Sequence, residues 1–240
     1  MNRKIFLIKI FITVAVIIFF SPKMTKALDV KQSKKTEIRY VPIGDSYTIG
    51  TGATEAQSWP ALLVEHLRSK GVNITLIENP ARAGWSIQEA MILELPVFKS
   101  AKPNFATLMI GVNDLVRGQD INIFRKHLQS LMDRMLSELP QHNRLVILTI
   151  PDFLMTPQGR AFSNGQDFAG KLQKFNAVIQ EEAKARNLVV IDLYPVSKQM
   201  GQDPTLIARD GLHPSAKEYA VWENEIFPKV FELLTISENQ

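Results

Sequence analysis

The stretch "RLVILTI", residues 144–150, is an almost continuous apolar run, and a second such run, "LVVIDL", follows at 188–193. Between them, "AGKLQKFNAVIQEEAKARN" (169–187) has the apolar spacing of an amphipathic helix. Strands without polar alternation are typical of sheets that are buried on both faces. A buried strand, a helix and a second buried strand therefore predict a parallel sheet covered by helices.

The same alternation continues along the rest of the chain. Further strands are predicted at 38–43, 74–78 and 105–111, and further helices at 58–71, 86–95, 120–139 and 215–234. Pro96 is expected to end the second of these helices, and Pro228 to kink or break the last. No internal repeat or second domain is evident, so one α/β domain is predicted.

The first 27 residues differ from the rest. Arg3 and Lys4 precede an apolar stretch from Ile5 to Phe20, and the segment "SPKMTKA" (21–27) then ends in small or polar residues. This layout predicts a signal peptide over 1–27, with an uncleaved N-terminal anchor as the alternative. A polar linker (28–37) and the folded domain (38–236) would follow, so we expect an extracytoplasmic protein, periplasmic or secreted. An uncleaved anchor would in addition bring the domain close to a membrane through the apolar segment.

Charge and cysteine content exclude several classes of function. Residues 1–35 have a net charge of +7 and the remainder −3, so the folded part carries no basic footprint for nucleic acid. The chain has no cysteine, which excludes disulfides, thiolate metal sites and a cysteine nucleophile.

The segment "VPIGDSYTIGTGA" (41–53) places Ser46 directly after the first predicted strand. Gly-Asp-Ser is ordinary turn chemistry, so the tripeptide alone does not distinguish a turn residue from a nucleophile. In open α/β sheets, however, ligands bind beyond the carboxyl ends of the strands. "NPARAGWS" (79–86) and "GVND" (111–114) follow the second and third strands, so these loops should gather with Ser46 at one edge.

A serine nucleophile needs a base, for which histidine is the usual residue. Of the four histidines, three fall in predicted helices or a polar turn: His66, His127 and His142. His213 lies in the loop "RDGLHPS" (209–215), three residues after Asp210. An acid at that spacing can hold one ring nitrogen and leave the other free. A plain helix-entry loop, with Ser215 as N-cap, is the alternative, but it leaves Asp210 and His213 unexplained.

Two further residues offer hydrogen-bond donors for an oxyanion. Asn113 presents a side-chain amide just after a strand, and Gly84 presents a backbone N–H with no side chain in the way. The Ser46 N–H would be a third donor.

Four blocks, "GDSYTIGTGA", "NPARAGWS", "GVND" and "DGLHP", resemble in sequence and order the four blocks of the SGNH hydrolases, the GDSL esterase/lipase family. "GVNDLVRG", "IPDF" and "DGLHPSAKEYAVW" resemble a secreted bacterial branch of it. The resemblance implies a three-layer α/β/α sandwich, flavodoxin-like, with a five-stranded parallel sheet. Tyr47 departs from the family's leucine, at a position that should face packing.

The resemblance also implies roles. Ser46 would be the nucleophile, His213 the base and Asp210 its orienting acid, and Gly84, Asn113 and the Ser46 amide would form the oxyanion hole. The implied reaction is hydrolysis of carboxylic esters through an acyl-enzyme, with a small-molecule or lipid ester as substrate and no cofactor or metal.

Several alternatives stay open. The substrate could be a lipid ester, a lysophospholipid, a small-acyl ester, a thioester or an O-acetylated glycan, and an acyltransferase would use the same site. A binding module without catalysis is the weakest of these. Nucleotide binding is disfavoured because "GTG" (50–52) lacks the rest of a dinucleotide or Walker motif.

Other residues around the predicted site are interpreted as supporting ones. Asp45 is interpreted as a backbone-bonding turn residue, and Asp114 and Asp152 as supporting or capping residues. Arg82, Trp85 and Arg117 are candidates for lining the cleft. The segment 152–170, which is rich in apolar residues, would be either a lid or wall over the site or simple packing of a long loop.

Overall fold

The computed structural model describes residues 37–163 and 167–236. Within them, five parallel strands form one sheet in the order β2-β1-β3-β4-β5, which confirms the predicted sheet. The strands are β1 (Ile38–Gly44), β2 (Ile74–Leu76), β3 (Phe105–Met109), β4 (Leu145–Leu148) and β5 (Val189–Ile191). The predicted signal segment, 1–27, and residues 28–36 of the predicted linker lie outside the described residues.

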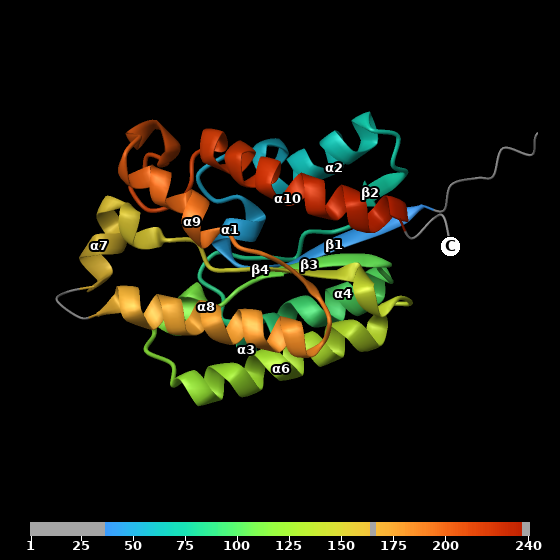
Figure 1. The fold of residues 1–240 in the computed structure, drawn as a ribbon, viewed down its shortest axis with the longest axis horizontal. Helices are drawn as coiled ribbons and strands as arrows, with labels where there is room; N and C mark the ends of the chain where they lie inside the picture. The colour runs from blue at the N-terminus through green and yellow to red at the C-terminus, as the bar shows by residue number, and fades with distance from the viewer. Residues whose placement is uncertain (1–36, 164–166, 237–240) are drawn as a thin grey trace, which may run out of the picture. The chain divides into compact units, whose positions relative to one another are not determined.

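Helices cover both faces of the sheet, which confirms the three-layer arrangement (Figure 1). On one side lie α2 (Trp59–Ser69) and α10 (Ala216–Ile236), and on the other α4 (Leu95–Ala101), α6 (Ile121–Glu138) and α8 (Phe168–Ala185). Shorter helices are α1 (Ser46–Ile49), α3 (Ile87–Glu89), α5 (Val112–Val116), α7 (Pro157–Ser163) and α9 (Tyr194–Ser197). No helix in the described ranges is both long and apolar enough to cross a membrane.

The strand order places a topological switch point between β1 and β3. The chain runs from β1 outward to β2 and then returns to β3 on the other side of β1, so the connections diverge between β1 and β3. In open α/β sheets, ligands bind beyond the carboxyl ends of the strands at such a switch point. Gly44 of β1 pairs with Met109 of β3, so the residues that follow both strands emerge at the same level.

The helix predicted over 86–95 is longer than expected, because Pro96 does not end it. α3 passes into a π-helical turn, η2 (Ala90–Glu94), and then into α4, where Pro96 occupies the first turn. A proline is tolerated in a first turn because the N–H there needs no helical partner. The prediction of a helix end at Pro96 was therefore wrong, because the π-helical turn before Pro96 places this residue in the first turn of the next helix.

Two other regions also differ from expectation. Pro228 lies inside α10 without breaking it. The segment expected to be a long loop contains a 3-10 turn, η4 (Phe153–Met155), and α7. Phe153 and Phe168 are buried and meet edge to face at 6.5 Å, so these two side chains belong to packing, whereas Phe162 is exposed.

Candidate active site

Ser46 lies on a tight turn between β1 and α1. The Asp45 carboxylate caps the helix by accepting the Tyr47 N–H at 3.1 Å, which confirms the prediction that the Asp45 side chain forms a hydrogen bond with the backbone. The Ser46 carbonyl accepts the N–H groups of Gly50 and Thr51, and Gly50, with φ of +89°, ends the helix. The Ser46 side chain stands at the first position of α1, with 6 % of the residue exposed.

Asp210 and His213 form a closed local unit. The Asp210 Oδ2 lies 2.6 Å from His213 Nδ1, while its Oδ1 accepts the backbone N–H groups of Leu212 and His213. Partial burial raises the pKa of the Asp210 carboxyl, but these hydrogen bonds outweigh it and hold the pKa below its usual range. The carboxylate is thus ionised and holds Nδ1, so Nε2 is the nitrogen left for a partner.

Several contacts hold the His213 loop against the turn that carries Ser46. The Tyr47 ring meets the His213 ring edge to face, with centroids 6.0 Å apart, and also packs on Trp222. At Gly52, whose φ is +100°, a Cβ would stand 3.2 Å from the Cβ of His213. The Tyr219 hydroxyl donates to the Thr51 carbonyl at 2.8 Å. Tyr47 is buried and packs, as predicted, and its packing brings the two segments together.

The loops with the predicted oxyanion donors are tied to each other. The Asn113 Nδ2 donates to the Trp85 carbonyl at 2.8 Å, which uses one amide hydrogen and leaves the second. Arg117 donates to the Gly84 carbonyl and to the Glu89 carboxylate. Gly84 has φ of +83°, and a Cβ there would meet nothing within 4 Å. Arg117, left open from the sequence, therefore braces the Gly84 loop.

Three acidic residues at this edge are buried. Asp114 accepts the N–H of Ile87 and so caps α3, and burial raises its pKa to about 6. Burial also raises the pKa of Asp45 to about 7. Sequence reasoning missed the third, Glu94, whose Oε2 accepts the Gly44 N–H at 2.9 Å. A lone carboxylate inside the apolar run "AMILELPVF" (90–98) was the signal that could have found it.

Asp152, which lies between β4 and η4, is also buried. Its backbone N–H donates to the Ser197 hydroxyl at 2.7 Å, and burial raises the pKa of its carboxyl. The following segment reaches the His213 loop, because the Gln158 N–H donates to the Gly211 carbonyl at 3.0 Å. The segment after β4 thus supports that loop.

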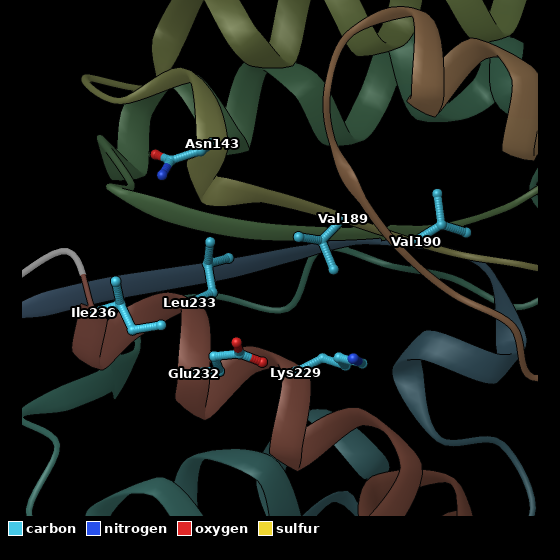
Figure 2. A pocket seen from close by; sticks show the side chains of 7 residues that line it. All are labelled: Asn143, Val189, Val190, Lys229, Glu232, Leu233 and Ile236. Carbon is cyan, nitrogen blue, oxygen red and sulfur yellow. The ribbon is translucent and has the colours of Figure 1, made fainter.

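A groove of about 380 Å³ lies elsewhere, between β5 and the end of α10 (Figure 2). Asn143 precedes β4 and Val189 begins β5, so the groove is at the amino ends of the strands, away from Ser46. Among residues 37–163 and 167–236, no group of three or more histidine or acidic residues is placed to hold a metal ion.

The model of the GDSL-like lipase/acylhydrolase family matches residues 43–221. No curated protein matches the chain.

Solved structures show the same fold at low identity. TesA has a TM-score of 0.66 and 19 % identity, covering 81 % of this chain and 99 % of its own. The lipase/acylhydrolase from Enterococcus faecalis has a TM-score of 0.64 and 24 % identity, with 81 % and 95 % covered. A family 3 carbohydrate esterase from Clostridium thermocellum has a TM-score of 0.66 and 21 % identity, with 83 % and 98 % covered.

Proposed function

The chain belongs to the GDSL-like lipase/acylhydrolase family, and on that basis we propose that it hydrolyses carboxylic esters through an acyl-enzyme on Ser46. The observation that carries the proposal is the 2.6 Å Asp210–His213 pair, packed through Tyr47 against the Ser46 turn. A nucleophile, a base and an acid that orients the base are the parts that serine-dependent acyl transfer needs.

The proposed reaction proceeds in two halves. His213 Nε2 takes the Ser46 proton as Oγ attacks the ester carbonyl, and the carbonyl oxygen becomes an oxyanion. His213 then returns the proton to the departing alcohol, which leaves an acyl group on Ser46. Water, activated by the same nitrogen, attacks the acyl group and releases the acid. Ionised Asp210 stabilises the imidazolium that forms in each half.

The amide of Asn113 and the N–H groups of Gly84 and Ser46 are proposed to bind the oxyanion. Asn113→Ala should lower kcat about a hundredfold or more, because one preorganised donor is lost where charge develops. KM should change much less, since the donor acts mainly in the transition state. Steady-state hydrolysis of a chromogenic acetate measures both.

Arg117→Met is the matched control for Asn113→Ala. Both variants lose a hydrogen bond that braces the loop 79–86, but Arg117→Met removes no proposed oxyanion donor. The variant loses the hydrogen bond to the Gly84 carbonyl and the ion pair with Glu89. Its kcat should nevertheless fall less than about tenfold, because neither contact stabilises the oxyanion. Equal losses in the two variants would mean that Asn113 acts by holding the loop.

The substrate is proposed to be a lipid ester, a lysophospholipid or a small-acyl ester. A chromogenic ester series from acetyl to palmitoyl, run on the purified protein, separates these classes by the preferred chain length. Failure of every ester, together with no labelling of Ser46 by a serine-directed phosphonate, would contradict the proposal.

An O-acetylated glycan is the second candidate substrate. Its support is the fold shared with the family 3 carbohydrate esterase and with an acetyl xylan esterase of 20 % identity and TM-score 0.65. Release of acetate from acetylated xylan, compared with release from a phenyl acetate, tests this candidate. Product analysis with an added alcohol distinguishes hydrolysis from acyl transfer.

We further propose that the protein works outside the cytoplasm, on the strength of the basic and apolar pattern in residues 1–27. N-terminal sequencing of the protein from fractionated cells tests this. A chain beginning near Leu28 outside the membrane indicates cleavage, and an intact chain in the membrane fraction indicates an anchor.

A further inference from the structure

Glu94 is an acid with no part in the reaction described so far. It ends the π-helical turn η2 and has 0 % of its surface exposed. Its Oε2 accepts the Gly44 N–H, whereas its buried Oε1 has no hydrogen-bond partner within the described residues. An unsatisfied buried carboxyl oxygen is costly and calls for a reason. π-Helical turns, which are rare, often occur at functional sites.

The position of Glu94 links it to Ser46. Gly44 is the last residue of β1, two residues before Ser46. A Cβ at Gly44 would collide with the Thr48 side chain and the Met109 carbonyl, so the backbone is tightly enclosed there. The Glu94 carboxyl thus holds the start of the turn that aims Ser46, while Asp45 caps its far side.

Burial, more than the neighbouring charges, favours the neutral form of Glu94. The Asp45 carboxylate repels an ionised Glu94, and Asp114 in turn repels an ionised Asp45. Arg82 is a cation that attracts an ionised Glu94. Two buried carboxyls close together do not both ionise readily. Burial, reinforced by Asp45, raises the pKa of Glu94 to about 8, although the Gly44 N–H and Arg82 act in the opposite direction.

We propose that Glu94 is a positioning residue for Ser46: its carboxyl fixes the β1–α1 turn by accepting the Gly44 N–H, and repulsion between Glu94 and Asp45 shifts that turn when both carboxyls are ionised. The inference rests on the proposed role of Ser46. Its consequence is an alkaline decline in kcat that belongs to Glu94 and not to the groups that touch the substrate.

Glu94→Gln is the decisive variant, because glutamine keeps an acceptor for the Gly44 N–H and does not ionise. Its kcat at pH 7 should stay within about threefold of the wild type, and the wild type's alkaline decline near pH 8 should move up by about one pH unit or more. Glu94→Leu removes the acceptor and should lower kcat about tenfold at every pH, with KM little changed. The proposal fails if wild type and Glu94→Gln decline at the same alkaline pH, or if the wild type does not decline.

Glu218→Gln is the matched control. Glu218 is also fully buried, accepts the Trp222 indole N–H, and has a pKa raised by burial to about 7. If loss of any buried acid shifted the profile, this variant would shift it too. We expect its alkaline decline to coincide with that of the wild type.

Thermal unfolding supplies a readout that does not depend on activity. The folded pKa of Glu94 lies above its ordinary value of 4.5, so the stability that its neutral form contributes is lost as pH rises toward 8. Between pH 4.5 and about pH 8, the Tm of the wild type should fall by several degrees relative to that of Glu94→Gln. A Tm difference between the wild type and Glu94→Gln that does not change with pH would overturn the inference. If Ser46 were neither labelled by phosphonate nor needed for hydrolysis, the proposed function would fail instead, and the Tm difference would remain.

Discussion

Ester hydrolysis by Ser46→Ala should fall about 10⁴-fold or more below that of the wild type, and the proposed oxyanion hole should keep a residual rate above the uncatalysed one. The substitution removes one oxygen and leaves the N–H of residue 46, the Asp45 cap and the Tyr47 packing in place. Without Oγ no acyl-enzyme can form, and His213 has no proton to take. Initial rates on a chromogenic acetate at high enzyme concentration measure the loss, and the Tm should match that of the wild type.

Ser58→Ala is the matched control for Ser46→Ala. Ser58 is likewise buried and lies in the same connection between β1 and β2, and its hydroxyl donates to the Glu55 carbonyl. Its activity should remain within about twofold of the wild type, as for a single lost neutral hydrogen bond away from the reaction. More than about 1 % residual activity in Ser46→Ala, free of wild-type contamination, would exclude Ser46 as the nucleophile.

The sheet was predictable because both of its faces are buried. Runs such as 144–150 and 188–193 are apolar throughout, and only a strand covered on both sides needs such a run. All five strands occur where the runs are, although β2 and β5 keep only three residues each in regular pairing. Periodicity does not give the order of the strands, which depends on contacts between distant parts of the chain.

Side-chain contacts could be predicted only between residues that are close together in the sequence. Asp210 and His213 are three residues apart in a turn, so their hydrogen bond follows from the spacing. The bonds from Asn113 to Trp85 and from Arg117 to Gly84 join separate loops, and no pattern in either loop predicts them. Glu94 was not predicted for a different reason. Because proline usually ends a helix, the sequence predicted a helix end at Pro96 and not the π-helical turn that buries Glu94.

Asp210→Asn should lower kcat about 10³- to 10⁴-fold while leaving the fold intact. The side-chain oxygen of the introduced asparagine can still accept the backbone N–H groups of Leu212 and His213, so the loop keeps its shape. The introduced amide nitrogen would then face His213 Nδ1 and donate to it, because the carboxylate oxygen that now accepts there is gone. The ring would carry its proton on Nε2, the nitrogen that has to receive the proton of Ser46.

Asp203→Asn provides the comparison that isolates this effect. Asp203 is also a partly exposed loop acid, close to Asp210 in the sequence, and its bonds to Lys217 and Thr205 lower its pKa to about 2. Removing its charge changes the loop's electrostatics without touching His213, so kcat should stay within about twofold. Phosphonate labelling of Ser46 should slow in parallel with hydrolysis in Asp210→Asn and remain normal in Asp203→Asn. A loss below about tenfold in Asp210→Asn would mean that the contact with Tyr47, and not the carboxylate, sets the orientation and tautomer of His213.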